Sequence, residues 1–180
     1  LLPVSSVMPH PLDPLIIIPA RLASTRLPDK PLADINGTPM IVRALRSAEA
    51  ADVGPVAVAC GDAAIAEAVT RAGGRAVITD PALRTGTDRV CAAADLLDPD
   101  RRHGVVVNLQ GDTPNLAPED VRAALDPLAD PAVDMATVAA LIRDPALYDD
   151  PNTVKAVAAI PPGARMGRAL YFSRARVPSG

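Results

Sequence analysis

Short runs of Val and Ile alternate with Ala- and Leu-rich stretches of helical periodicity over roughly the first two-thirds of the chain. Four runs have the length and the apolar side chains of buried strands, and they cover residues 15–18, 55–60, 75–79 and 105–107. Strands that alternate with helices pair in parallel, because each helix returns the chain to the same edge of the sheet. The pattern therefore predicts an α/β fold, a mostly parallel sheet with helices on both faces and with residues 105–107 as a central strand.

The composition limits what fills the core and what the chain can bind. Hydrophobic residues make up 49% of the sequence and aromatic residues 2%, so we expect a core of Ala, Val, Leu and Ile. A formal net charge of -3, without basic clusters among aromatics, argues against nucleic acid as a partner. No apolar run reaches the roughly 18 residues of a membrane span, so we expect no membrane insertion. Cys60 and Cys91 lack metal or redox spacing, which predicts two small buried hydrophobes in a reducing cytosol.

Several helix ends can be predicted from capping residues. Thr38 is expected to cap a helix with Pro39 in its first position, and Asp62 is expected to cap the next helix. Gly73 and Gly74 should end that second helix, because glycine adopts the left-handed conformation that closes helices. Further helices are expected at residues 87–97 and 118–128.

The pattern changes after Pro131, where helical periodicity gives way to three strand-like runs at residues 135–142, 153–159 and 168–172. Such runs predict an antiparallel extension that folds over the active edge of the sheet. We therefore expect a disordered lead-in at residues 1–14, an α/β core at residues 15–130, for which the loops below indicate nucleotide binding, and a strand-rich extension at residues 131–180.

The loop after the first strand is rich in cations and prolines. Residues 19–32 contain Arg21, Arg26 and Lys30 together with two hydroxyl side chains. Ligands of open α/β sheets bind beyond the carboxyl ends of the strands, and arginine forks with a lysine ammonium suit a nucleoside triphosphate. A surface loop without a ligand is the alternative. The sequence has neither a GxxxxGK[ST] nor a GxGxxG motif, which argues against P-loop kinases and Rossmann dehydrogenases.

Two later loops carry further polar residues where a sheet edge would place them. Residues 84–89 open a helix, whose N–H groups and hydroxyls could bind ribose, base or phosphate; a plain helix cap is the alternative. Residues 108–114 place Asp112 after a strand and a glycine. A carboxylate there is a suitable Mg²⁺ ligand, although aspartate is also a common turn residue.

These segments together resemble the signature of the 3-deoxy-manno-octulosonate cytidylyltransferase family. Residues 18–32 follow its IPAR-x-x-STRLP-x-KPL pattern and residues 35–41 its ING-x-PMI pattern. The likeness runs from about residue 15 to residue 178. Shorter matches are SGT-[ED]-R, with Thr85 in place of Ser, at residues 85–89, VNVQGDEP at residues 107–114, PNTVK at residues 151–155 and ALYFSR at residues 169–174.

The resemblance implies a three-layer, Rossmann-like nucleotidyltransferase sheet and a set of site residues. Arg21, Lys30 and Asp112 would be catalytic, with Asp112 as the ligand of Mg²⁺. Gln110 and Arg174 would bind the sugar acid, while Lys155 is open between a role there and a solvated charge on a strand. The nucleotide-binding residues would be Pro19, Ala20, Arg21, Ser24, Arg26, Lys30, Thr85, Gly86, Thr87, Arg89 and Gln110.

Three features depart from the family pattern. Thr113 stands where the family carries Glu, which could weaken metal binding or the organisation of the loop. The family's HxGxYxYR segment and its second metal-binding Asp have no counterpart here, so we expect a C-terminally incomplete chain. The two histidines, His10 and His103, lie elsewhere, and His103 is expected at the surface in a polar turn.

The resemblance implies a cytoplasmic homodimeric enzyme of lipopolysaccharide biosynthesis. It would couple CTP and 3-deoxy-D-manno-octulosonate to give CMP-3-deoxy-D-manno-octulosonate and pyrophosphate. Two alternatives remain open at this point: a nucleotidyltransferase for another sugar acid, and a non-catalytic nucleotide-binding remnant.

Overall fold

The computed structural model describes residues 10–22 and 29–178 of the 180-residue chain. The chain divides into two compact units, one ending at Ala129 and the other beginning at Asp130, and each is described by itself. The predicted lead-in falls mostly outside the described residues, although a turn joins His10 to Asp13 directly before the first strand. None of the helices in the described part of the chain has the length and apolar composition that a membrane crossing requires.

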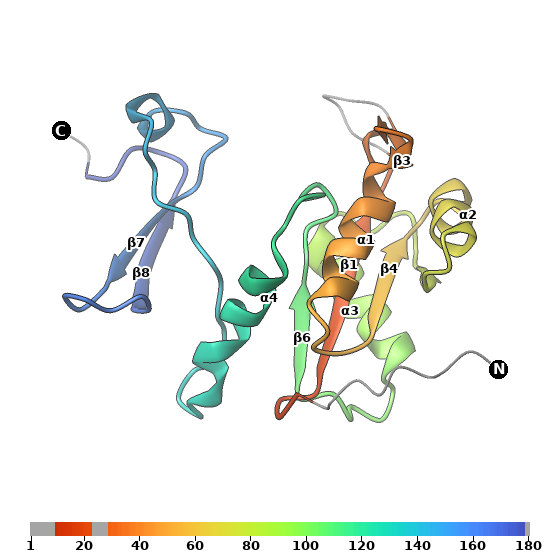
Figure 1. The fold of residues 1–180 in the computed structure, drawn as a ribbon, viewed down its shortest axis with the longest axis horizontal. Helices are drawn as coiled ribbons and strands as arrows, with labels where there is room; N and C mark the ends of the chain where they lie inside the picture. Colours follow the sequence, from red (N-terminus) through yellow and green to blue (C-terminus); the bar gives the residue numbers. More distant parts are fainter. Residues whose placement is uncertain (1–9, 23–28, 179–180) are drawn as a thin grey trace. The chain divides into compact units, whose positions relative to one another are not determined.

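The first unit is built on a sheet of four parallel strands (Figure 1). In spatial order they are β5 (Ala76–Ile78), β4 (Val56–Cys60), β1 (Pro14–Ala20) and β6 (Val105–Asn108). Strand β1 is paired on both sides, since Ile16 lies opposite Val56 of β4 and Val107 of β6. The predicted α/β fold with a mostly parallel sheet is therefore confirmed.

Strand β6 occupies an edge of this sheet, so the prediction of a central strand at residues 105–107 is wrong for the described part of the chain. Val106 is 44% exposed, whereas Ile16 and Ile17 of β1 are fully buried. A run of β-branched residues predicts a strand, but it carries no information about which strands lie on either side of it.

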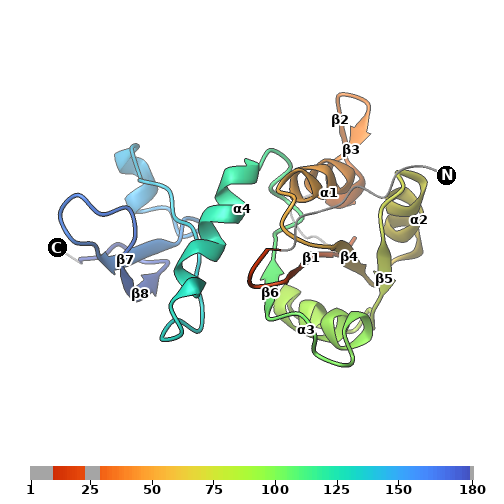
Figure 2. The ribbon, with the colours of Figure 1, turned by 60° about the horizontal axis from the view of Figure 1, so that its bottom comes forward.

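Helices cover both faces of the sheet (Figure 2). On one face, Ile16 and Ile18 of β1 pack in a core with Ile41 and Leu45. On the other face, Leu15 and Ile17 form a second core with Val90, because successive strand side chains point to opposite faces. This confirms the three-layer arrangement. The first face carries α1 (Met40–Ala50), α2 (Ala63–Arg71) and α4 (Pro118–Leu125), which leads into η2 (Asp126–Ala129), and the second carries α3 (Gly86–Leu97).

The predicted helix caps are only partly right. Helix α1 begins at Met40 with Pro39 as its N-cap, because Thr38–Pro39 forms the short strand β3 and pairs with β2 (Asp34–Ile35). Asp62 does occupy the N-cap position of α2, but its carboxylate makes no hydrogen bond to that helix. Gly73, with a φ of 81°, follows α2 and closes it as predicted.

The two cysteines differ in environment, so the prediction that both are buried is wrong for one of them. Cys60, the last residue of β4, is buried, and this burial raises the pKa of its thiol. Cys91 is exposed. It follows Val90 in α3, and Val90 and Ala93 form the side of the helix that faces the sheet.

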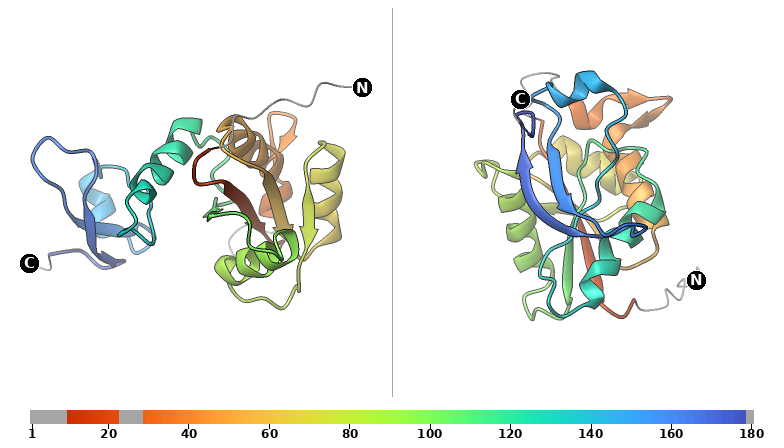
Figure 3. Two further views of the ribbon diagram at one scale, coloured as in Figure 1. Left: turned by 90° about the horizontal axis from the view of Figure 1, so that it is seen from below. Right: turned by 90° about the vertical axis from the view of Figure 1, so that its left-hand side faces the viewer.

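The second unit contains one antiparallel hairpin, formed by β7 (Lys155–Ala159) and β8 (Arg168–Ser173) (Figure 3). The short 3-10 helix η3 (Pro145–Tyr148) precedes it. The antiparallel pairing confirms two of the three strands predicted after Pro131. The strand predicted at residues 135–142 is wrong, because these residues form no strand and Met135 and Leu141 are 88% and 78% exposed. An alternating pattern becomes a strand only where a neighbour supplies hydrogen bonds to its backbone.

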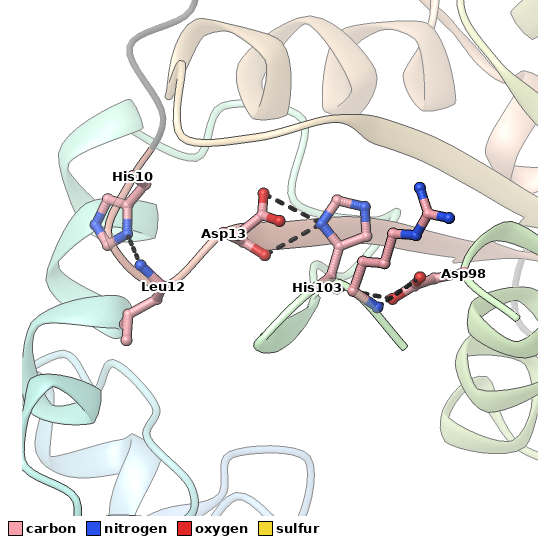
Figure 4. A network of polar contacts seen from close by, with 6 residues as sticks. His10, Leu12, Asp13, Asp98 and His103 are labelled. Carbon is pink, nitrogen blue, oxygen red and sulfur yellow. Dashed lines mark hydrogen bonds and ion pairs between the residues drawn. The ribbon is translucent and has the colours of Figure 1, made fainter. Parts of the chain in front are cut away.

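A polar network joins the beginnings of β1 and β6 at the amino end of the sheet (Figure 4). His103 Nδ1 lies 3.3 Å from the carboxylate of Asp13, directly before β1. The carboxylate of Asp98 accepts hydrogen bonds of 2.8 Å from the backbone N–H groups of Arg102 and His103. The side chain of His103 is therefore half-buried rather than at the free surface, being 21% exposed.

The hydrogen bonds of the Asp98 carboxylate lead us to expect that the stability of the fold depends on pH. The hydrogen bonds from the Arg102 and His103 backbone hold the pKa of Asp98 below its usual range. A lowered folded-state pKa means that the stabilisation is present above the unfolded-state pKa, about 4, and is lost as pH falls through the folded-state value. Thermal unfolding should thus show Asp98→Ala below wild type at pH 7, with the gap closing as the pH falls below about 4. The control is Asp95→Ala, since Asp95 is exposed and 3.8 Å from Arg101. An equal gap at pH 7 and at low pH would contradict the assignment.

Candidate functional site

The strand order of the first unit has a switch point between β1 and β6. From β1 the chain proceeds to β4 and β5 on one side and then returns to β6 on the other. The strand order therefore reverses between β1 and β6. Ligands of open α/β sheets bind at such a switch point. The residues that follow β1 and β6 are accordingly the first place to look for a site.

An ion pair links these two connections. Lys30 Nζ donates to Asp112 Oδ2 at 2.8 Å, across 82 positions in the sequence. The two side chains are 38% and 54% exposed, so both remain accessible to a ligand. An exposed pair contributes at most about 1 kcal/mol to stability. Its importance is therefore positional: one cation and one carboxylate, both accessible, lie together at the switch point.

Backbone packing holds the three predicted loops close to one another around Pro19. A Cβ atom added to Gly111 would lie 3.0 Å from the Pro19 carbonyl oxygen, and one added to Gly86 would lie 3.4 Å from Pro19 Cγ. The absence of a side chain at Gly111 thus permits the close approach of its loop to the end of β1, whereas the distance at Gly86 is an ordinary van der Waals contact. Ala20, the last residue of that strand, is buried. Two of the predicted residues, Pro19 and Gly86, thus lie close together at the carboxyl end of β1, with Gly111 beside Pro19.

Arg21 and Leu22 connect the first loop to two neighbouring loops. The guanidinium of Arg21 donates to the carbonyl of Arg84 at 3.3 Å, and the Leu22 N–H donates to Asp62 Oδ2 at 3.1 Å. Asp62 has no predicted site role, but the structure brings it to the first loop. Its position directly after β4, at the same sheet edge as the other loops, is the signal that could have revealed this contact.

In the second predicted segment, residues 84–89, several polar groups already make hydrogen bonds within the protein. Thr85 forms a capping box at the start of α3: its hydroxyl accepts from the Asp88 N–H, and the Asp88 carboxylate accepts from the Thr85 N–H. Arg89 is 2% exposed, and its guanidinium donates to Thr79 Oγ1 at 2.5 Å and to the Asp80 carbonyl at 3.3 Å. Thr87 and Gly86 are exposed in the first turn of the helix. The structure therefore places Arg89 beneath the loop, where it supports the loop's backbone.

The loop that carries Asp112 is closed by Thr113. The hydroxyl of Thr113 donates to the Gln110 carbonyl at 2.7 Å, and its N–H donates to the same oxygen at 3.2 Å. The Gln110 side chain is exposed and donates to Asn108 Oδ1 at 3.0 Å. Thr113 therefore gives the turn a local hydrogen bond at the position where the family pattern has a glutamate.

The remaining predicted residues belong to the second unit or lie outside the described residues. Ser24 and Arg26 belong to the part of the first loop that the structure does not describe. Arg174 belongs to the second unit, where it is exposed and donates to the Pro151 carbonyl at 3.0 Å. Lys155 lies in the same unit and is 4% exposed, so it is not a solvated charge on a strand.

The side chains around Asp112 suit a metal ion that takes most of its ligands from a bound substrate and from water. Within residues 10–22 and 29–178, no group of three or more His, Cys, Asp or Glu side chains is arranged to hold a metal ion. Mg²⁺ commonly takes one or two carboxylates and completes its coordination with phosphate oxygens and water. One accessible carboxylate beside a lysine fits that kind of ion, and it does not fit a structural zinc site.

Comparisons with known proteins agree with this fold. A family model described as Cytidylyltransferase matches residues 15–180. The chain therefore belongs to the cytidylyltransferase family.

Three of the similar proteins carry closely related names. The 3-deoxy-manno-octulosonate cytidylyltransferase of Rhodospirillum centenum is 61% identical over 94% of this chain and 66% of its own length. The enzyme of that name from Paramagnetospirillum magneticum is 52% identical, over 93% and 68% of the two lengths. A solved structure of CMP:2-keto-3-deoxy-manno-octonic acid synthetase complexed with CTP superposes with a TM-score of 0.70 at 35% identity, covering 93% of this chain and 66% of that one. The resemblance found in the sequence is thereby confirmed, and the chain spans about two thirds of the length of these relatives.

The capping box at the start of α3 leads to a prediction about the stability of the fold. Thr85→Ala removes the acceptor for the Asp88 N–H and should lower the free energy of unfolding by about 1 kcal/mol. Thr85→Ser keeps a hydroxyl and should stay near wild type. Urea denaturation measures both. If Thr85→Ala unfolds at the wild-type urea concentration, the capping box does not stabilise the fold.

Proposed function

We propose that this chain forms the nucleotide-binding part of a 3-deoxy-manno-octulosonate cytidylyltransferase. The enzyme transfers the cytidylyl group of CTP to the anomeric hydroxyl of the sugar acid and releases pyrophosphate. The proposal depends on one structural observation, the pairing of Lys30 with Asp112 across the sheet's switch point. The 61% identity to a curated enzyme of this name and the CTP complex of a similar fold support the choice of nucleotide and acceptor.

The reaction asks the protein mainly to hold phosphate groups in line and to neutralise charge. The sugar hydroxyl attacks the α-phosphorus of CTP and loses its proton to water, the bond to the bridging oxygen breaks, and pyrophosphate takes the electron pair. Arg21 has a guanidinium suited to a two-pronged contact with phosphate oxygens, while the Lys30 ammonium acts as a compact charge. Both residues follow β1, where the loop is tied to Asp62 and to the Arg84 carbonyl.

Asp112 is the residue that would hold Mg²⁺. A bound Mg²⁺ supplies positive charge to the triphosphate and to the departing pyrophosphate. The pairing of Asp112 with Lys30 keeps the two groups in place before substrate arrives. On this proposal, Lys30 exchanges its carboxylate partner for phosphate oxygens when the nucleotide binds.

The other predicted contacts complete the proposal. Thr85, Gly86, Thr87 and Gln110 lie at the loops that border the switch point and suit contacts with the nucleotide, and Arg89 supports the second of these loops. Arg174 is an exposed guanidinium suited to the carboxylate of the sugar acid. The dimer, the cytoplasmic location and the role in lipopolysaccharide biosynthesis stay predictions.

Pyrophosphate release tests the proposed reaction directly. The complete protein with CTP, 3-deoxy-manno-octulosonate and Mg²⁺ should release pyrophosphate, and a chelator such as EDTA should abolish the release. N-acetylneuraminate in place of the first acid tests the alternative acceptor. If calorimetry shows that the nucleotide binds, but CTP releases no pyrophosphate with either acid, the result would favour the non-catalytic alternative and overturn the proposal.

Single substitutions test the roles of the first loop. Arg21→Ala or Lys30→Ala in the complete protein should reduce kcat/KM for CTP at least about 100-fold. One charged hydrogen bond contributes about 1.5–3 kcal/mol, and a tenfold change in rate corresponds to about 1.4 kcal/mol, so the loss of two such bonds to the triphosphate lowers the rate at least about 100-fold. Arg71→Ala is the matched control, since Arg71 is an exposed arginine at the end of α2. A near-normal rate in either loop variant would remove that residue from the proposed machinery.

A further inference from the structure

Lys155 is a buried cation whose partners are all main-chain oxygens. Its Nζ donates to the carbonyls of Asp150, Thr153 and Arg174 at 2.7, 2.8 and 2.7 Å. The residue is 4% exposed at the start of β7. An ammonium has three N–H donors, and each of them has an acceptor here. The arrangement offsets the cost of burying a charge without a paired carboxylate.

The three carbonyls come from two separate segments of the second unit. Asp150 and Thr153 belong to the turn before β7, and Arg174 follows the end of β8. The turn is itself organised by the Asp150 carboxylate, which accepts from the N–H and the side chain of Asn152 and from the Thr153 hydroxyl. Lys155 therefore joins the turn before β7 to the backbone that carries the Arg174 side chain.

The choice of lysine at this position is unusual for this chain. Among its 18 basic residues, two are lysines and the others are arginines. The second lysine, Lys30, is the one that meets Asp112. A guanidinium spreads its donors over a plane and cannot direct three of them from one nitrogen toward three carbonyls. The three carbonyls around Lys155 Nζ, called the cage below, therefore require a compact cation.

We propose that Lys155 is a positioning residue: its ammonium fills a monovalent-cation site of three main-chain carbonyls and thereby sets the backbone at Arg174. The Arg174 guanidinium is in turn held by the Pro151 carbonyl of the same turn. The backbone of Arg174 is thus held by Lys155 and its guanidinium by the turn that Lys155 also binds, and this is the side chain proposed to bind the sugar acid. This second step rests on the proposed function, whereas the cation site itself does not.

Chemical rescue tests the cation site without reference to catalysis. Lys155→Ala leaves the three carbonyls unpaired and should lower Tm by at least about 5 °C. Propylammonium chloride, which reproduces the atoms from Cγ to Nζ, should restore at least half of that loss. Tetramethylammonium chloride at equal ionic strength has no N–H donors and should restore none. Arg168→Ala, at an exposed position at the start of β8, is the control and should respond equally to both salts. Equal response of Lys155→Ala to the two salts overturns the cation site.

Lys155→Arg tests the positioning role and remains informative if the alanine variant does not fold. It keeps the charge but cannot serve three carbonyls from one nitrogen. We expect KM for the sugar acid to rise at least tenfold while KM for CTP stays within about twofold. An unchanged KM for the sugar acid, or an equal rise in both constants, overturns the positioning role. A wild-type protein that releases no pyrophosphate defeats the proposed function and the positioning step together, while the salt dependence of Tm still decides the cation site.

Discussion

The pairing of β1 with a parallel strand on each side is the constraint on which the rest of the first unit depends. The strand is buried on both faces and hydrogen-bonded along both edges, with Ile16, Ile17 and Ile18 fully enclosed. Its carboxyl end cannot move without disturbing both cores. The loop that follows it is therefore anchored at Pro19 and Ala20, and the neighbouring loops pack against that anchor through glycines. A site for a highly charged ligand gains from such an anchor, because preorganised charges need no rearrangement when the ligand arrives.

The two lysines show how one residue type serves two purposes in one chain. Lys30 is accessible and pairs with a carboxylate that can exchange it for another ligand. Lys155 is enclosed by neutral carbonyls and has no such freedom. The difference lies in solvent exposure and in the partners, since both side chains carry the same charge. Arginines supply most of the other cations, including Arg89, whose buried guanidinium supports the loop between β5 and α3.

Much of the fold could be predicted from local pattern alone. The four strands of the first sheet, the three longer helices of that unit, the hairpin β7–β8 and the stop at Gly73 follow from periodicity and glycine chemistry. The errors arise where a distant partner decides. Residues 135–142 have a strand pattern but no strand partner among the described residues, and Thr38 joins a strand pair rather than capping a helix. The contact of Asp62 with Leu22 and the cage around Lys155 span 40 and up to 19 positions, so no local pattern contains them.

The sequence by itself determined the family, the α/β class and the identity of the charged residues after each strand, because these depend on side-chain chemistry and short spacings. Tertiary structure decided that β6 lies at an edge among the described strands, that Lys30 and Asp112 meet, and that Arg89 and Lys155 are buried while Cys91 is exposed. Burial and pairing are properties of surfaces brought together by folding. Burial and pairing depend on which strands become neighbours, and the order of strands in a sheet does not follow from their order in the chain.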